Sequence, residues 1–343
     1  MNHERKLGFW LGALAALHVV IACAGFFAPY DPTVQNRERP YAPPQRLHWT
    51  DAQGKFHLLR PFVYAIRVKE GTFDEYKQDL SRPVHLRFLV LGARYKLLGM
   101  FPCRLHLFST DGSPVFLMGS DAYGRDLYSR TLYGGQISVL AGLLAAGLAL
   151  ILGWTLGAAA GFFGGWADTL LMRTGELFLA LPWLYLLFAA RAFLPLSLSP
   201  WRTFFLIVVL VGAVGWARPA RLIRGVVLSV RGRDYVRAAR GFGATNFYLL
   251  RNHVLPETWS VMFTQAAILV PQYILAEVTL SFLGLGVAEP VPSWGNLLAS
   301  LQQYNVLTSY WWMCLPGVAM VPFFLGYLVL TSALQQKANA SKI

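Results

Sequence analysis

The sequence predicts an all-α polytopic membrane protein with six transmembrane helices and a small β-containing extracytoplasmic domain between the first two. Of the 343 residues, 55% are hydrophobic and only 14% are charged, whereas a soluble domain carries about 25% charged residues. The apolar residues gather in runs that are long enough to cross a bilayer. The basic residues, which give a formal net charge of +13, flank these runs, so a lipid bilayer is favoured over a nucleic acid as their partner.

The first apolar run covers residues 7–28 and predicts a transmembrane helix within the N-terminal segment 1–29. The stretch Ala22-Cys23-Ala24 also resembles the end of a cleavable signal peptide. A cleaved leader would leave five spans. We expect the helix to be retained, because an even number of spans agrees with the distribution of basic residues.

Five more apolar runs follow residue 118. A spanning helix needs about 20 apolar residues, because the hydrocarbon core of a bilayer is about 30 Å thick. The runs cover residues 137–162, 176–194, 201–216, 259–285 and 311–334. The run at 201–216 is the weakest, because its uninterrupted apolar core, Phe204 to Ala217, has only 14 residues.

Basic residues in the short loops predict the orientation, since cytoplasmic loops are enriched in lysine and arginine. The segment 218–257 holds eight arginines and two acidic residues, whereas residues 286–310 hold no lysine or arginine. The eight are Arg218, Arg221, Arg224, Arg231, Arg233, Arg237, Arg240 and Arg251. We therefore expect a bacterial inner-membrane protein with both termini in the cytoplasm and residues 30–118 outside.

Residues 30–118 are predicted to form the extracytoplasmic domain, with short strands. Hydrophobic and polar residues alternate from Val84 towards Val90, which is typical of a half-buried strand. The domain either packs as a cap on the helices or serves as a docking surface or gate. Its residues leave both interpretations open.

The most informative loop runs from Arg233 to Pro256. We expect two short helices, residues 235–240 and 247–253, joined by a turn at Gly243. Asp234 is expected to cap the first helix, and Pro256 to close the second. A rigid hairpin between two spans suits the transfer of motion from a soluble partner to transmembrane helices.

This loop resembles the signature loop of importer permeases of the ATP-binding-cassette (ABC) family. That signature runs Glu-Ala-Ala, three residues, Gly, nine residues, Ile-x-Leu-Pro. Here the spacing is the same, with Arg237-Ala238-Ala239, then Gly243, then His253-Val254-Leu255-Pro256. The resemblance implies that Arg237, Ala238, Ala239, Gly243, Leu255 and Pro256 couple to an ATPase subunit. The family's glutamate is replaced by Arg237, which implies a different surface on that partner.

Further motifs are similar to those of the second permease subunit of the dipeptide/oligopeptide/nickel branch. They cover most of the chain from Gly119 to the C-terminus, so residues 119–343 are identified as the permease domain. The motifs are Gly119–Asp126, Ser129-Arg130 with Gly134, Gly161–Trp166, Ala180-Leu181-Pro182, Leu280–Gly286 and Pro292–Asn296.

The resemblance implies a non-catalytic transmembrane subunit of a binding-protein-dependent importer for peptides or similar small solutes. Its implied partners are a homologous second permease, two ABC ATPases and a periplasmic solute-binding protein. ATP and magnesium would be bound by the ATPases, and no cofactor by this chain. Peptides, nickel chelates and oligosaccharides all stay open as substrates.

The residues themselves agree with a chain that does no chemistry. Gly119–Gly124 is followed by Arg125-Asp126 rather than Lys-Ser/Thr, so it is not a phosphate-binding loop. The three cysteines lie far apart, and the histidines have no metal-ligand spacing. We predict no catalytic residue and no metal site.

Two sets of residues are expected to support the helices. Asp121, Arg125, Asp126 and Arg130 are predicted to form a polar network at the periplasmic mouth of the second span, because charges in such places are usually paired. Small residues, Gly153, Gly157 and Gly161, recur on one face of that span. Such faces allow close helix packing, either within the subunit or against the partner permease.

Glu277 is the sharpest candidate for the translocation path. It is an acidic residue inside the span 259–285, which also carries Gln265 and Gln272. Carboxylates in a membrane are costly and usually face a bundle interior or an aqueous path. Pro271 is a candidate hinge in the same helix. A hydrogen bond from Glu277 to a neighbouring helix is the alternative.

Three other classes of protein fit the sequence less well. An ion-coupled secondary transporter would need internal repeats with broken helices and several intramembrane charges, and the sequence offers no clear repeat and few such charges. A receptor would need a signalling domain in the cytoplasm. A membrane enzyme would need a nucleophile and base or a metal site.

Overall fold

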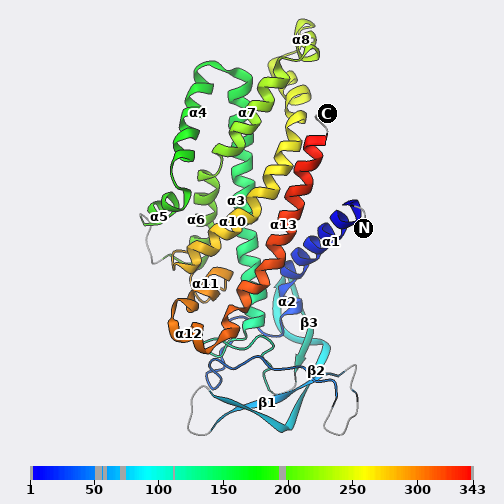
Figure 1. Cartoon of the computed structure of the whole chain (residues 1–343), viewed down its shortest axis with the longest axis vertical. Helices are drawn as coiled ribbons and strands as arrows, with labels where there is room; N and C mark the ends of the chain where they lie inside the picture. Colours follow the sequence, from blue (N-terminus) through cyan, green and yellow to red (C-terminus); the bar gives the residue numbers. More distant parts are fainter. Residues whose placement is uncertain are drawn as a thin grey trace. The chain divides into compact units, whose positions relative to one another are not determined.

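The computed structural model describes residues 3–50, 56, 60–69, 75–110, 113–192 and 198–340. They form many helices and one small sheet (Figure 1). The chain divides into two compact units. The helical unit comprises Met1–Leu11, Val139–Leu280 and Phe324–Ile343, and the sheet unit comprises Gly12–Ser138 and Ser281–Phe323.

Long helices contribute residues to both units. They are α1 (His3–Ala22), α3 (Leu127–Phe163), α10 (Trp259–Phe282) and α13 (Leu315–Ala340). The helical unit adds α4 (Gly165–Ala180), α5 (Trp183–Ala192), α6 (Pro200–Val214), α7 (Ala217–Arg231), α8 (Asp234–Gly241) and α9 (Asn246–Leu249). The sheet unit adds α2 (Ala24–Phe27), α11 (Trp294–Ala299) and α12 (Tyr304–Ser309).

Three helical stretches in the described part of the chain are long and apolar enough to cross a membrane, namely residues 127–163, 246–282 and 311–336. Two further pairs of helices are long and apolar enough only when the members of each pair are taken together. The axes of α4 and α5 differ by 91°, and those of α6 and α7 by 41°. The number rises to five if each bent pair is one span, and residues 8–22 form a shorter apolar helix. The chain is thus a mostly helical, multi-pass membrane protein, and six spans stay a prediction.

The two bends have local causes. Helix α4 ends at Ala180, and Leu181 is extended, as is usual before a proline such as Pro182. Helices α6 and α7 are separated by Gly215 and Trp216. The weak predicted span at 201–216 therefore continues past its apolar core as a second, amphipathic helix that buries Ile223 and Val227.

The glycine face of α3 packs against α7 within the helical unit. A side chain at Gly153 would place its Cβ 2.6 Å from Pro219 Cβ, and one at Gly161 would lie 2.9 Å from the carbonyl oxygen of Arg224. Gly157 lies against the backbone of Ala220. The absence of side chains on this face is what allows the two backbones to approach.

The sheet is antiparallel, with strands β1 (Phe62–Val68), β2 (Tyr76–Leu97) and β3 (Phe101–Thr110) in that order. Strand β2 has 22 residues, so the prediction of short strands is wrong for it. Its first half pairs with β1 and its second half with β3. The long strand is thus the shared partner of two shorter ones.

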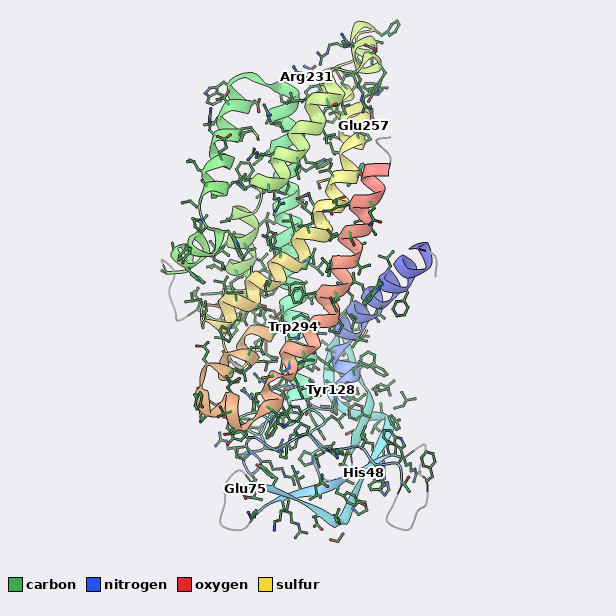
Figure 2. The ribbon with its side chains drawn as sticks, in the orientation of Figure 1. His48, Glu75, Tyr128, Arg231, Glu257 and Trp294 are labelled. Atoms are coloured by element: carbon green, nitrogen blue, oxygen red, sulfur yellow. The ribbon has the colours of Figure 1, made fainter. Side chains whose placement is uncertain are left out.

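The core of the sheet unit explains the alternation seen in the sequence. Val84 and Leu86 are buried, while His85 and Arg87 point outward. The alternation of burial ends at Phe88, which is 49% exposed, and Leu89 has a φ of +52°. Tyr128, near the start of α3, packs on the same core, with its ring 6.0 Å from that of Phe108 (Figure 2).

Candidate functional site

The loop from Arg233 to Pro256 folds as a hairpin of two short helices, which we call the hairpin. Helix α8 starts at Asp234, so this residue is the first helical residue and not the predicted cap, which is Arg233. Thr245 caps α9, since its hydroxyl accepts a hydrogen bond from the backbone N–H of Tyr248 at 3.3 Å.

The second arm of the hairpin does not end at Pro256, so that prediction is wrong. Helix α9 continues through a π-helical turn, Leu250–Val254, and a 3-10 turn, Leu255–Thr258, into α10. Pro256 lies in the first positions of the 3-10 turn, where a helix does not need the missing N–H. The arm is therefore continuous with a candidate membrane span.

The turn of the hairpin requires a glycine. Gly243 has φ of +89°, which side-chain-bearing residues rarely adopt. The N–H of Gly243 donates to the carbonyl of Arg240 at 3.0 Å, and that of Ala244 donates to the carbonyl of Ala239 at 3.1 Å. These two bonds form a Schellman motif, which satisfies the last carbonyls of α8.

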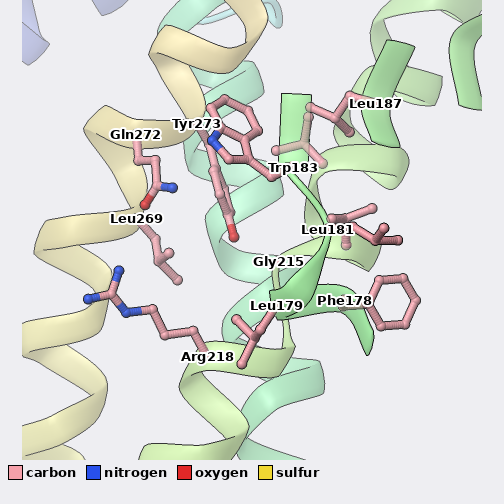
Figure 3. Close-up of a pocket in the computed structure, with 12 residues that line it drawn as sticks. Phe178, Leu179, Leu181, Trp183, Leu187, Gly215, Arg218, Leu269, Gln272 and Tyr273 are labelled. Atoms are coloured by element: carbon pink, nitrogen blue, oxygen red, sulfur yellow. The ribbon is translucent and has the colours of Figure 1, made fainter. Parts of the chain in front are cut away.

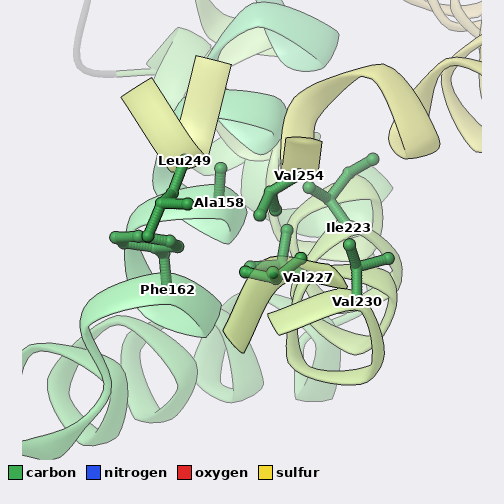
Figure 4. Close-up of a cluster of buried hydrophobic side chains, with 8 residues drawn as sticks. Ala158, Phe162, Ile223, Val227, Val230, Leu249 and Val254 are labelled. Carbon is green, nitrogen blue, oxygen red and sulfur yellow. The ribbon is translucent and has the colours of Figure 1, made fainter. Parts of the chain in front are cut away.

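A small hydrophobic cluster holds the hairpin against α3 and α7 (Figure 4). Among the described residues of α8 and α9, each helix buries a single side chain, Val236 and Leu249. The full cluster is Ala158, Phe162, Ile223, Val227, Val230, Val236, Leu249 and Val254. The hairpin is therefore anchored on its inner side, where Ala239, Ala244, Leu250 and Leu255 also pack against the cluster, and Phe242 and Phe247 remain exposed.

Polar contacts fix the base of the hairpin (Figure 2 labels Arg231 and Glu257). The Arg231 guanidinium donates to the carbonyl of Phe162 at 2.7 Å. Arg233 lies 3.6 Å from the carboxylate of Glu257. These contacts tie α7 to the end of α3 and the first arm of the hairpin to the second.

The outer side of the hairpin is aromatic and basic. Phe242 is 93% exposed and Phe247 is 71% exposed. An open groove of about 450 Å³ lies beside them, between Ala239, Tyr248 and His253. A contiguous patch of exposed apolar side chains marks a docking surface, whereas single ones do not, and here Phe242 and Tyr248 line the same groove.

Of the residues that match the coupling signature, Ala239 and Gly243 line the groove, and Leu255 packs against the inner cluster. Arg237 and Ala238 are exposed, and Ala239 is half-buried. In the second arm, Leu255 is half-buried and Pro256 is exposed. The Arg237 guanidinium is 2.8 Å from the carboxylate of Asp234, one turn earlier in α8. An aspartate in the same helix therefore offsets the charge that replaces the family's glutamate.

A cavity of about 220 Å³ lies in the helical unit where the two bent pairs break (Figure 3). It is lined by residues on both sides of each break and by α10. Gln272, one of the predicted path residues, lines it together with Tyr273 and Arg218. Sequence reasoning missed the last two, although Tyr273 is a neighbour of Gln272.

The other predicted path residues lie in α10 but do not line this cavity. Pro271 is inside an uninterrupted helix. The Glu277 side chain is 1% exposed. Gln265, on the same helix, is also buried, and no described group donates a hydrogen bond to its side-chain oxygen. Helix α10 thus carries Gln265, Gln272 and Glu277 among its buried or half-buried polar side chains.

In the sheet unit, the structure brings Asp121, Arg125 and Arg130 together with Glu289; these four residues are the polar network. Arg125 Nε is 2.7 Å from Asp121 Oδ2 and its Nη1 is 2.7 Å from Glu289 Oε2. Arg130, which is fully buried, reaches Glu289 Oε1 at 2.7 Å. Sequence reasoning missed Glu289, although it is the sole acidic residue of the segment 286–310.

Asp126 is buried beside this network but has different partners. Its Oδ2 accepts hydrogen bonds from the N–H and hydroxyl of Ser129, at 2.8 and 2.6 Å. No described group donates to Oδ1. Burial raises the pKa of Asp126 to about 6, because the charged form loses its hydration.

The segment around Trp294 packs on the start of α3. Ser293 and Asn296 form a capping box at the start of α11. The Trp294 indole donates to the carbonyl of Thr131 at 3.0 Å, and its backbone N–H donates to the Ser138 hydroxyl at 3.1 Å. The motif from Pro292 to Asn296 thus shapes the packing of the sheet unit.

Known proteins are similar to the chain over more than half of its length. The Bacillus subtilis (strain 168) dipeptide transport system permease protein DppC is 36% identical over 194 residues, 57% of this chain and 58% of that protein. The Escherichia coli (strain K12) protein named as a probable D,D-dipeptide transport system permease, DdpC, is 37% identical over 215 residues, 63% of this chain and 70% of that protein.

The chain thus spans less than two thirds of the length of DppC from B. subtilis. The predicted resemblance to dipeptide and oligopeptide permeases is confirmed. The family model described as "Binding-protein-dependent transport system inner membrane component" matches residues 130–340, which leaves out α1, α2 and the sheet. The chain belongs to the family of binding-protein-dependent transport system inner membrane components.

Proposed function

We propose that the chain is the transmembrane permease subunit of an ATP-driven importer for peptides or similar small solutes. It forms half of the translocation pathway and couples to an ATPase through the hairpin. The observation that carries this proposal is an outer surface with exposed Phe242 and Phe247 on a hairpin anchored from the inside.

The construction of the hairpin supports this role. Because α9 continues into α10 without a break, a force on the hairpin acts directly on a candidate membrane span. The cluster around Ile223 and Leu249 links the same hairpin to α3 and α7. A partner that grips the exposed aromatic residues therefore moves a packed set of helices, because interiors close to crystal density transmit displacement.

The proposed assembly has four further subunits. A homologous permease completes the pathway, two ABC ATPases bind ATP with magnesium, and a solute-binding protein delivers the solute. The chain itself has no catalytic role and crosses the bacterial inner membrane six times. Its termini and the hairpin are in the cytoplasm and residues 30–118 are outside, in agreement with the four arginines of the hairpin, Arg233, Arg237, Arg240 and Arg251.

The pathway is proposed to switch between two packings of the helices. ATP binding closes the ATPases and draws the hairpins together, which opens the pathway outward. Gln272 and Glu277 in α10 lie along or beside the path, and Pro271 lets the helix bend. If Glu277→Gln leaves uptake and assembly unchanged, Glu277 has no role in the path.

Purification of the tagged chain from its native membranes in mild detergent tests the proposal. Mass spectrometry of the co-purifying proteins is expected to identify an ATPase, a second permease and a solute-binding protein. ATP-dependent uptake of dipeptides into vesicles that contain this complex is the second expected result. Recovery of the chain alone, with uptake driven by an ion gradient, would instead establish a secondary transporter.

A further inference from the structure

We propose that the cavity at the two helix breaks binds a carboxylate group of the transported solute, and that Arg218 recognises it. The proposal rests on the proposed function, since it names a binding group on the path of the same transporter. It assigns a role to Arg218, which lies just after the apolar run 201–216.

The cavity exists because two candidate spans break at adjoining places. The 91° bend between α4 and α5 is at Leu181-Pro182, and the 41° bend between α6 and α7 is at Gly215-Trp216. Both breaks line the cavity. Broken helices leave space and backbone dipoles inside a bundle, and transporters use such places for solutes.

Gly215, at the second break, leaves room for the hydroxyl group of Tyr273. The Tyr273 hydroxyl lies directly over Gly215, where any side chain would collide with it. No described residue hydrogen bonds to this hydroxyl. Because position 215 has no side chain, the Tyr273 side chain can form part of the cavity wall. Its hydroxyl group can then hydrogen bond to a ligand in the cavity.

Arg218 is the charged residue of the cavity lining. Figure 3 shows its side chain extending from α7 towards α10, where Leu269 and Gln272 lie. In the described part of the chain, no acidic group pairs with it. Its neighbour Arg224, by contrast, forms a bidentate pair with Asp168, with Nη2 and Oδ2 2.6 Å apart.

The remaining lining determines which anion suits the cavity. Apart from the guanidinium, the polar side chains are the amide of Gln272 and the hydroxyl of Tyr273. The other walls are aromatic and aliphatic, including Phe178 and Trp183. A guanidinium beside apolar walls fits the C-terminal carboxylate of a peptide whose last residue has an apolar side chain, because the planar fork binds two carboxylate oxygens at once.

A cysteine reporter tests this inference on the full-length chain in detergent. The free cysteines Cys23, Cys103 and Cys314 are first replaced by alanine. Leu179→Cys is then introduced, because Leu179 lines the cavity and is 42% exposed. Labelling rates are measured with an anionic and a cationic methanethiosulfonate reagent, with and without L-alanyl-L-alanine or its C-terminal amide.

Alanyl-alanine is expected to protect the reporter, and its amide to protect at least about tenfold less well, as expected for the loss of a charge-assisted pair. Arg218→Gln should raise the concentration needed for half-protection by about tenfold and lower the anionic-to-cationic labelling ratio. Arg218→Lys should retain that ratio. The matched control is Arg221→Gln, since Arg221 is exposed on the same helix but does not line the cavity.

Three results overturn the inference. They are no protection at the highest soluble peptide concentration, equal protection by the peptide and the amide, and an equal loss of protection in Arg218→Gln and Arg221→Gln.

This measurement can fail independently of the test of the proposed function. Co-purifying partners and ATP-dependent uptake without carboxylate-dependent protection leave the importer standing and remove this site. Protection that depends on Arg218, without partners, leaves the site standing and removes the importer.

Discussion

The polar network and the hairpin use charged residues in opposite ways. In the polar network, Arg130 is fully buried and Arg125 is 7% exposed, and each is held by carboxylates at 2.7 Å. In the hairpin, the pair of Arg237 and Asp234 is exposed on both sides. Buried groups of this kind are costly to disturb, whereas exposed pairs contribute about 0–1 kcal/mol.

The comparison teaches that a family motif does not reveal whether its residues serve the fold or a partner. Gly119–Asp126 and the signature of the hairpin both mark the family, yet Asp121, Arg125 and Asp126 of the first are buried in the sheet unit, whereas Arg237, Ala238 and Pro256 of the second are exposed. Substitutions in the network should therefore act on stability. Substitutions on the outer side of the hairpin should act on coupling.

The largest effect on stability is expected for Arg130→Met. Removing Arg130 leaves Asp121 and Glu289 to share Arg125 alone, and the loss of one member of a largely buried charge cluster costs about 3 kcal/mol. Thermal unfolding of the purified chain, followed by tryptophan fluorescence, should show a clearly lower midpoint. Arg173→Met is the control, because Arg173 pairs with Glu176 on an exposed helix face. Equal shifts for both variants would contradict the contrast between buried and exposed pairs.

The second effect concerns pH and Asp126. Its pKa is raised to about 6 in the folded chain from an ordinary value of 3.8, so the folded state keeps a proton that the unfolded state has lost. Stability should therefore fall by about 3 kcal/mol as the pH rises from about 4 to 6, and change little from this group above that range. Unfolding midpoints across this range measure the decline.

Asp126→Asn is the variant that isolates this contribution. An asparagine oxygen can still accept the two bonds from Ser129 but does not titrate in this range. In the variant, the free energy of unfolding should therefore fall less between pH 4 and 6 than in the unmodified chain. An unchanged slope would show that other groups cause the pH dependence.

The third effect is a change of the hairpin turn by Gly243→Val. A residue with a side chain at positive φ costs about 1–2 kcal/mol, and a β-branched residue costs more. The added side chain meets no atom within 4 Å, so the cost comes from the backbone alone. Membrane insertion should persist, while ATPase capture and ATP-driven uptake should fall.

Gly241→Val is the matched control for this turn. Gly241 also has no atom within 4 Å of an added Cβ, but it lies in α8 rather than at a positive φ. It should keep normal coupling. Normal transport by Gly243→Val, or an equal loss in both variants, would remove the assignment of this turn to coupling.

The smallest effect on stability is expected for Phe242→Ala. Because Phe242 is 93% exposed, its loss should change the free energy of unfolding by less than about 0.5 kcal/mol. The dissociation constant of the ATPase should nevertheless rise about tenfold, because exposed aromatic residues often contribute most of the binding energy of an interface. Phe163→Ala, another exposed phenylalanine outside the hairpin, should leave capture unchanged.

Much of the hairpin could be predicted from the sequence because its determinants are local. Gly243 reverses the chain because it tolerates a positive φ, and the flanking residues have helical propensity. The fate of Pro256 was not predictable in this way. A proline usually stops a helix, but here a π-helical turn and a 3-10 turn place it where no N–H is required.

The polar network shows the opposite case. The sequence places Asp121, Arg125 and Arg130 within ten residues of each other, and so predicts their proximity. It does not indicate that Glu289, about 160 residues later, bridges the two arginines. That pairing depends on how the segment before α11 packs on the start of α3, which Trp294 and Ser138 control.

By itself, the sequence determined the membrane class, the positions of the apolar runs, the alternation in β2 and the turn at Gly243. Each follows from the hydropathy or the backbone preference of neighbouring residues. Only the tertiary structure decided that Glu289 closes the polar network, that Phe242 is exposed, and that Arg218 shares a cavity with Tyr273. These depend on contacts between distant segments, which form only when the helices and strands pack.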